Sequence, residues 1–206
     1  MKHQHYKEID STQSKACELA SQYEELLISA QKQLRGRGRR DNKWEDLDNS
    51  LAMSFKISPS DKPTLLALEI AVHLTNYFKD DKLTLKWPND IYNSEDQKIA
   101  GILVNKEDNN YIVGIGINYG PDFGNVNTKY GQLNSGSVLK EEDYKNIPLN
   151  IYNYIINNRL TDDQIVKKWV AKCFHIDTKC KIVDGTDIAE GQFIGIGKFG
   201  EAIIEE

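Results

Sequence analysis

The sequence predicts an α+β fold in which a mixed, largely antiparallel sheet is flanked by helices and followed by a small β module. Up to residue 173, short apolar runs of strand length alternate with segments whose apolar residues recur at helical spacing. Beyond residue 178, short β-type runs are separated by glycines. A length of 206 residues suits one substantial domain, expected at 1–175, and an appendage at 176–206 too small for its own core.

The first part of the chain is expected to hold three strands, two helices and a long loop. Ser11 or Thr12 can cap a helix that runs to about Tyr23, because a hydroxyl accepts from the free amides of a first helical turn. The segment 31–49 is polar and lacks a period, so we expect a long loop there, of a length that is usually functional or disordered. Strands are expected at 7–9, 26–30 and 51–57. Pro63 suits the start of a second helix with the apolar stripe Leu66, Ile70, Leu74 and Phe78.

The rest of the chain alternates in the same way, with a Gly- and Asn-rich loop at 122–136. Pro88 stops one strand, and Thr161 gives a capping signal for the last helix. Trp169, on that helix, is expected in the hydrophobic core of the protein, whereas His3 and His5 are expected in a mobile terminus. Strands are expected at 83–87, 99–105, 111–118, 181–183, 189–194 and 202–204, and helices at 141–158 and 161–173.

Composition and charge exclude several classes of protein. A net charge of −5 argues against bulk nucleic-acid binding. Residues 31–43 nevertheless carry six basic residues and one acidic residue, which predicts a small anionic ligand or a solvated loop. No apolar run is long enough to span a membrane and no signal-peptide core is present, so a cytoplasmic location is expected. The three cysteines form no CxxC pair, which favours reduced thiols.

Three short motifs carry the chemistry of the sequence. Glycines interleaved with arginines allow the backbone to approach an anion that guanidinium groups then hold, and lysines offer compact charges for phosphate oxygens. In order, the motifs are Gly36-Arg37-Gly38-Arg39-Arg40, Lys86-Trp87-Pro88-Asn89-Asp90 and Lys98-Ile99-Ala100-Gly101. Together they resemble one family closely, the biotin protein ligases. The resemblance is specific over about residues 7–120 and implies the fold shared with class II aminoacyl-tRNA synthetases, with an SH3-like C-terminal module.

The resemblance also implies roles for individual residues. Lys98 and Arg39 would be catalytic: Lys98 would contact the biotin carboxylate and the phosphate, and Arg39 would hold the adenylate phosphate. Asp90 would lie on the metal side of the nucleotide. Biotin would be bound by Ser11, Thr12, Gln13, Gln33, Gly36, Arg37, Gly38, Lys98 and Gly101. The nucleotide would be bound by Arg39, Arg40, Trp44, Lys86, Asn89 and Asn118.

The reaction that the resemblance implies has two steps. Biotin and ATP, with Mg2+, would give biotinyl-5′-AMP, and the biotin would pass to a lysine of the biotin carboxyl carrier protein of acetyl-CoA carboxylase. The loop at 31–49 would shield the intermediate from water. The chain would be a short form without an N-terminal DNA-binding domain, so no DNA and no membrane partner is expected, and it would be a monomer or weak homodimer.

Departures from the family pattern keep other functions open. Asp41 and Asn42 follow the arginines where a glycine and a basic residue are usual, Gln13 replaces an asparagine, and the C-terminal module is short. A non-catalytic biotin sensor is one alternative. A lipoate or octanoate ligase is another, although its different arginine-rich loop is not found. The last is an RNA-binding protein, which the acidic net charge disfavours.

Overall fold

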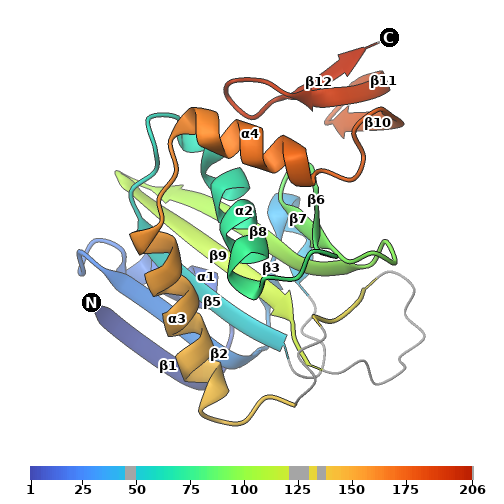
Figure 1. The fold of residues 1–206 in the computed structure, drawn as a ribbon. Coiled ribbons are helices and arrows are strands. Elements are labelled where there is room, and N and C mark those ends of the chain that lie inside the picture. The colour runs from blue at the N-terminus through green and yellow to red at the C-terminus, as the bar shows by residue number, and fades with distance from the viewer. Residues whose placement is uncertain (45–49, 121–129, 134–137, 206) are drawn as a thin grey trace.

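A seven-stranded mixed sheet forms the centre of the computed structural model, which describes residues 1–44, 50–120, 130–133 and 138–205 (Figure 1). The outer pair β1 and β2 is parallel and every other neighbouring pair is antiparallel, as predicted. In spatial order the strands are β1 (Lys2–Ile9), β2 (Leu26–Gln33), β5 (Ser50–Ile57), β9 (Asn110–Asn118), β8 (Lys98–Glu107), β7 (Asp90–Tyr92) and β6 (Thr84–Lys86).

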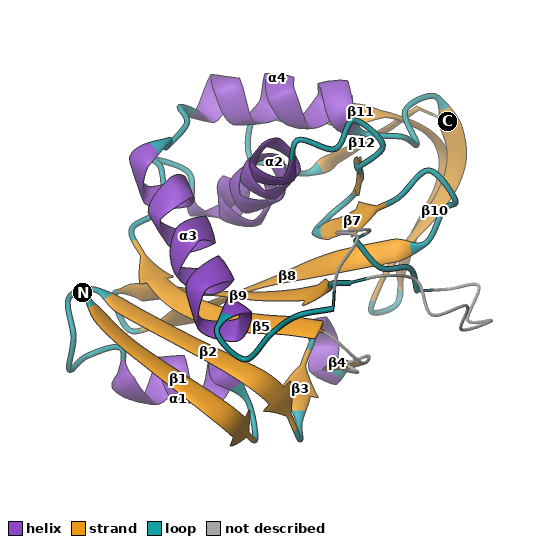
Figure 2. Cartoon of the chain, turned by 60° about the horizontal axis from the view of Figure 1, so that its bottom comes forward, coloured by secondary structure: helices purple, strands orange, loops and turns teal. Residues whose placement is uncertain are grey.

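Helices cover both faces of this sheet (Figure 2). Successive side chains of a strand point to opposite faces, so Leu27 packs towards one layer of helices while Leu26 and Ile28 pack towards the other. Each face therefore has its own apolar cluster, and the larger one contains Trp169, as predicted. One layer consists of α2 (Leu66–Phe78), α3 (Asp143–Asn157) and α4 (Asp162–Lys172), and α1 (Thr12–Leu19) covers the other face. No helix of the described residues is both long and apolar enough to cross a membrane.

Local capping signals fix where the helices begin. Ser11 caps α1 by accepting from the Ser14 N–H at 3.3 Å, and Thr161 forms a capping box with Gln164 at the start of α4. The short helix η2 (Pro63–Leu65) leads into α2 from a proline. Helix α1 ends at Leu19, earlier than predicted, in a turn that the Gln22 N–H closes on the Leu19 carbonyl.

Several sequence expectations need correction. β1 starts at Lys2, and His3 and His5 are ordered on it because both rings hydrogen-bond Ser29 Oγ, at 2.9 and 3.0 Å. β7 was not predicted. The expected loop at 31–49 is structured in part, while its residues 45–49 and most of the loop at 122–136 lie outside the described residues. The ordered part contains β3 (Gly36–Arg37), η1 (Arg39–Asp41) and β4 (Lys43–Trp44).

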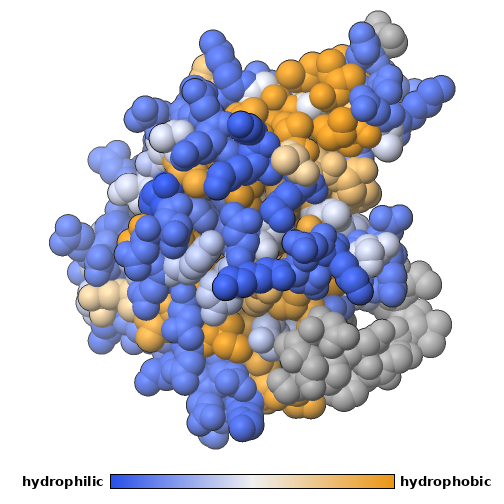
Figure 3. Space-filling model, in the orientation of Figure 1, coloured by the Kyte–Doolittle hydropathy of each residue, from blue (hydrophilic) through white to orange (hydrophobic). Residues whose placement is uncertain are grey.

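The C-terminal β module packs directly on the main domain. Phe193 and Ile196 belong to the larger core cluster, so this module depends on the main domain for its apolar packing, as its size predicts. Its outer side is less covered: Ile188 and Phe199 are exposed, and Figure 3 shows apolar surface at this end of the molecule. The antiparallel strands are β10 (Thr178–Asp184), β11 (Asp187–Ile196) and β12 (Ala202–Glu205). The expected boundary at residue 175 stays a prediction.

A buried carboxylate connects helix α2 to the segment between α3 and α4. Glu69 of α2 accepts two hydrogen bonds from the Arg159 guanidinium, at 2.8 and 3.0 Å, and one from the Leu160 N–H at 3.0 Å. His73 adds a contact at 3.4 Å. Burial alone would raise the pKa of Glu69, but these donors outweigh burial and lower the pKa to about 2.

Candidate functional site

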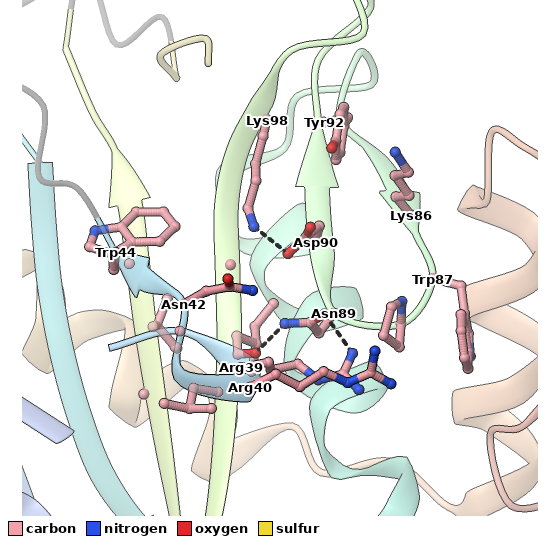
Figure 4. A pocket seen from close by; sticks show the side chains of 18 of the residues that line it. Arg39, Arg40, Asn42, Trp44, Lys86, Trp87, Asn89, Asp90, Tyr92 and Lys98 are labelled. Atoms are coloured by element: carbon pink, nitrogen blue, oxygen red, sulfur yellow. Dashed lines mark hydrogen bonds and ion pairs between the residues drawn. The ribbon is translucent and has the colours of Figure 1, made fainter. Parts of the chain in front are cut away.

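A cavity of about 1250 Å³ lies where strands β7, β8 and β9 meet the short strand β4 and the C-terminal module. Its walls come from segments far apart in the sequence, including the start of α1, the end of β2, the turn after β6 and strand β10. The three sequence motifs converge here: Arg39, Asn89 and Lys98 all line the same space (Figure 4).

Hydrogen-bonded polar side chains line one end of the cavity. Ser54 Oγ donates to Thr12 Oγ1 over 2.9 Å, and Thr12 Oγ1 donates to Gln33 Oε1 over 3.1 Å. The Thr12 main-chain N–H donates to the same Gln33 oxygen over 2.9 Å. Thr12 and Ser54 are buried, so a ligand at this end meets hydroxyl and amide groups whose positions are already fixed.

Gln13 places an unpaired acceptor at the same end. Its Nε2 donates to Asn105 Oδ1 at 2.9 Å and to the Ile112 carbonyl at 3.0 Å, which fixes the orientation of the amide because a main-chain carbonyl only accepts. Its Oε1 is buried and has no hydrogen-bond partner within the described part of the chain. A buried oxygen without a donor is costly, so this end of the cavity favours a ligand that donates an N–H or O–H.

The Trp44 indole rests on a platform made by two opposed glycines. Gly101 of β8 faces Gly116 of β9 in the ladder. A Cβ at Gly116 would overlap the indole, and one at Gly101 would lie 3.2 Å from its Cζ3. Lys98 Nζ lies 5.7 Å from the centroid of the same ring. Trp44 therefore brings a flat apolar surface into the centre of the cavity.

Basic side chains gather at the other end of the cavity. Lys98 Nζ forms an ion pair with Asp90 Oδ1 at 2.7 Å, and Arg39 Nη1 donates to Asn89 Oδ1 at 3.2 Å (Figure 4). Asn89 is fixed in turn, because its Nδ2 donates to the Ile102 carbonyl at 2.6 Å. Lys86 Nζ lies 4.9 Å from the Tyr92 ring. This end can attract a polyanion, since one carboxylate faces several cations.

The arginine loop is held at three points. The Gly38 N–H donates to the Asn42 carbonyl at 2.7 Å, and Arg37 Nη1 reaches Ser14 Oγ at 3.5 Å. Arg40 adopts a left-handed backbone conformation with φ 53° and ψ 45°. Its Nη1 donates to the Val183 carbonyl at 3.0 Å, which connects the loop to the C-terminal module. The positive charge is thus presented on an ordered turn.

Most of the predicted site residues line the cavity, but Ser11 and Gly36 do not. The Ser11 hydroxyl is used as the cap of α1, and Gly36 permits the close approach of β4, since a Cβ there would lie 2.6 Å from the Trp44 carbonyl oxygen. The predicted ligand contacts of these two residues are not supported by this geometry. The predicted residues that line the cavity are Thr12, Gln13, Gln33, Arg37, Gly38, Arg39, Arg40, Trp44, Lys86, Asn89, Asp90, Lys98, Gly101 and Asn118.

Sequence reasoning missed several residues of the cavity wall. Ser54 is a polar residue inside an apolar strand, and that irregularity was a usable signal. Lys179 adds positive charge from β10, where Lys181 also lines the cavity but pairs with Glu190, and His175 lies at the junction of the main domain with the module. No local pattern marks these three residues as part of a site.

The described residues do not fit a metal ion held by the protein. They contain no group of three or more His, Cys, Asp or Glu side chains suited to a metal. Asp90 is the only carboxylate among the described residues that line the cavity, and it is paired with Lys98. Because Mg2+ takes oxygen ligands in octahedral geometry, the predicted metal role of Asp90 gains no support from this arrangement.

Comparisons with known proteins agree with the sequence motifs. Residues 6–122, more than half of the chain, match the model of the biotin/lipoate A/B protein ligase family. The bifunctional ligase/repressor BirA of Bacillus spizizenii is 36% identical over 124 residues. That alignment covers 53% of this chain and 38% of the relative, so the chain spans well under half the length of that protein.

Solved structures of biotin protein ligases share the fold. A complex of the Aquifex aeolicus enzyme with biotin and ATP has a TM-score of 0.77 at 25% identity, covering 98% of this chain and 90% of that one. Biotin acetyl coenzyme A carboxylase synthetase of Helicobacter pylori, with bound biotinylated ATP, has a TM-score of 0.67 at 25% identity, covering 98% and 88%. Sequence and fold agree, and the chain belongs to the biotin/lipoate A/B protein ligase family.

Proposed function

We propose that the chain is an ATP-dependent biotin protein ligase. The observation that carries the proposal is that one cavity has a polar end and a basic end. At the polar end lies the buried acceptor Gln13 Oε1, which has no partner among the described residues, and at the basic end lie Arg39 and Lys98. Family membership and the ligands named for the two structural relatives support the same function. The cavity is suited to a neutral polar head group at one end and to phosphates at the other.

The polar end suits the ureido ring of biotin. That ring offers two N–H donors and one carbonyl acceptor. Gln13 Oε1 accepts one N–H, and the hydroxyl and amide groups of Thr12 and Gln33 complete the set. Arg37 and Gly38 of the arginine loop close over the ring. The apolar part of the acid then runs along β8 and β9 towards Lys98.

The basic end brings two anions together. The biotin carboxylate and the α-phosphate of ATP repel each other, and Lys98, Arg39 and Lys86 offset this repulsion. A carboxylate oxygen bonds to the α-phosphorus while the bond to the pyrophosphate oxygen breaks, which gives biotinyl-5′-AMP and pyrophosphate. Trp44 and Asn118 contact the adenine end, and Arg40 adds charge beside the phosphates. Arg39 retains the adenylate.

The second step transfers biotin to protein. The free ε-amine of a lysine attacks the carbonyl carbon of the mixed anhydride, its bond to the phosphate oxygen breaks, and AMP leaves while the amine releases a proton. We propose the biotin carboxyl carrier protein of acetyl-CoA carboxylase as the acceptor. The Helicobacter pylori relative, a biotin acetyl coenzyme A carboxylase synthetase, supports this choice.

Mass spectrometry of the acceptor tests the proposal. The purified chain is incubated with biotin, Mg-ATP and a purified carrier domain, and the modified lysine is mapped by peptide fragmentation. We expect one biotinyl group on one lysine, and none when that lysine is replaced by arginine or when ATP is omitted. A reference biotin ligase run in parallel with the same biotin, ATP and carrier serves as the positive control. A carrier that the reference ligase biotinylates but this chain leaves unmodified would contradict the proposed transfer.

A further inference from the structure

The main-chain N–H of Trp87 donates to the imidazole of His175, with 3.0 Å between the nitrogen atoms. A main-chain N–H only donates, so Nε2 of His175 must be the unprotonated nitrogen and the ring proton resides on Nδ1. The segment of His175 runs beside β6, because the Phe174 N–H donates to the Leu85 carbonyl at 3.3 Å. The imidazole therefore supplies an acceptor to the turn that follows β6.

This turn leads to Asn89, the residue that contacts Arg39 in the cavity. The Trp87 side chain is held as well, since its Nε1 donates to the Gly200 carbonyl at 2.9 Å. Two residues later, Asn89 accepts from Arg39 Nη1 at 3.2 Å (Figure 4). The orientation of the Arg39 guanidinium thus depends on Asn89. The position of Asn89 depends on its hydrogen bonds with Ile102 and on the turn before it, which His175 helps to hold.

We propose that His175 is a positioning residue for adenylate formation: its neutral imidazole holds the turn at 87–89 where Asn89 orients Arg39 towards the phosphate. The proposal rests on the proposed function, because the phosphate contact of Arg39 is what it affects. It requires no contact between His175 and the substrate. No motif of the sequence assigns a role to this histidine.

The surroundings of His175 favour the neutral ring. Its ring packs against Phe193 of β11, Trp169 of α4 and Phe174, with centroids 4.3, 6.4 and 5.5 Å apart. Among the described residues, Lys86 of β6 is the charged group that acts on it. Burial and then the Lys86 charge lower the pKa of His175 from its ordinary value of 6.5. Protonation at lower pH would set two N–H donors against each other and release the turn.

The pH dependence of biotin-dependent ATP–pyrophosphate exchange tests this role in three proteins: the unchanged chain, His175→Gln and His175→Ala. Glutamine places an acceptor near the position of Nε2 but does not titrate. In the unchanged chain we expect kcat/KM for ATP to decrease as the pH is lowered. In His175→Gln this decrease, the acid limb of the pH profile, should be absent. In His175→Ala kcat/KM for ATP should be about three- to tenfold lower at neutral pH, the effect of one lost hydrogen bond, with KM for biotin unchanged.

A matched control and a second readout separate this role from simple loss of packing. His3 is also half-buried with a lowered pKa but lies on β1, so His3→Gln should keep the acid limb. In ¹H–¹⁵N spectra, the Trp87 main-chain and indole N–H resonances should titrate with His175 in the unchanged chain and not in His175→Gln.

The spectra need no catalysis, so the two failures are distinguishable. If the unchanged chain lacks exchange activity, the proposed function fails, and the role of His175 in adenylate formation fails with it even where the Trp87 resonances show the contact. If exchange is normal but His175→Gln keeps the acid limb, or if the Trp87 resonances ignore the titration of His175, the positioning role alone is overturned.

Discussion

Lys98 Nζ lies 2.7 Å from Asp90 Oδ1, and both side chains are about four-fifths buried at the edge of the cavity. The two residues face each other from β8 and β7, neighbouring strands of which only β8 was predicted. The ammonium is thus held in one place before any phosphate arrives. Such preorganisation stabilises a transition state more than a mobile charge does.

Lys98→Ala should abolish adenylate formation, because Lys98 is the cation that its ion pair with Asp90 holds where the carboxylate meets the α-phosphate. We expect a loss of at least about 100-fold in kcat for biotin-dependent exchange. Asp90→Asn should cost less, about tenfold, since the ammonium remains but is no longer fixed. The double variant should match Lys98→Ala, because the two residues act together. Additive losses would show that Asp90 acts independently of Lys98.

Arg39→Gly should release the adenylate early. Arg39 is the guanidinium that Asn89 orients, and without it the reactive anhydride escapes before transfer. The expected result is biotin on many proteins of a mixture, detected by streptavidin blotting, whereas the unchanged chain labels the carrier alone. Arg35→Gly is the control, because Arg35 is exposed and pairs with Asp10 at 3.7 Å. Labelling confined to the carrier in Arg39→Gly would refute the retention role.

Two glycines on the same face of β9 should separate biotin binding from ATP binding. In Gly114→Ala the new Cβ overlaps Gln13 Oε1, and in Gly116→Ala it overlaps the Trp44 indole. Overpacking of this kind typically costs 1–3 kcal/mol, so we expect about a tenfold rise in KM for biotin in the first variant and for ATP in the second. Trp44→Ala should largely remove the additional effect of Gly116→Ala. Steady-state kinetics measure both constants, and equal effects on both substrates would contradict the assignment.

The buried Glu69–Arg159 pair should contribute to stability in a pH-dependent way. The folded pKa of Glu69 is lowered to about 2 from 4.5, so its contribution is complete above about pH 4.5 and is lost as the pH falls towards 2. Arg159→Leu should cost about 3 kcal/mol of unfolding free energy at neutral pH, because it removes the guanidinium that neutralises the buried Glu69 carboxylate. The same substitution should also weaken the dependence of the unfolding free energy on pH in the acid range. Urea unfolding at several pH values measures both effects.

The exposed pair Lys7–Glu141 provides the control for that measurement. Both side chains are mostly exposed at an ion-pair distance of 2.9 Å, so solvent screens the interaction. Lys7→Ala should leave the unfolding midpoint unchanged at neutral pH. An equal loss in Lys7→Ala and Arg159→Leu would show that burial of Glu69 is not the source of the effect.

The elements with strong local signals could be predicted from the sequence. The apolar runs of β5, β8 and β9 and the stripe of α2 are set by the period of their own residues, and caps such as Thr161 lie next to the helices that they start. The motifs located most of the cavity for a similar reason. Their residue types match anion chemistry, and they occur in a fixed order.

The rest depends on contacts that no local pattern contains. β1 is mostly polar, and it is placed by pairing with β2 and by the hydrogen bonds of its histidines to Ser29. The pairing of β3 with β4 requires Gly36 to lie against Trp44. The turn that joins these two residues has no periodic pattern of apolar residues from which the pairing could be predicted. Ser11 has the same chemistry as a cap and as a biotin ligand, so its residue type could not separate the two roles. His175 and its partner Trp87 are 88 positions apart in the sequence, so no local pattern could predict their contact.

ATP–pyrophosphate exchange by the purified chain tests the central claim most directly, with biotin, lipoate or no acid added. The cavity predicts exchange that depends on biotin, because Gln13 Oε1, which has no partner among the described residues, and its polar neighbours suit a ureido ring. Exchange with lipoate instead of biotin would contradict this assignment and favour the lipoate branch of the family. If the chain binds biotin but catalyses no exchange with either biotin or lipoate, the catalytic role is contradicted and a biotin-sensing protein is favoured.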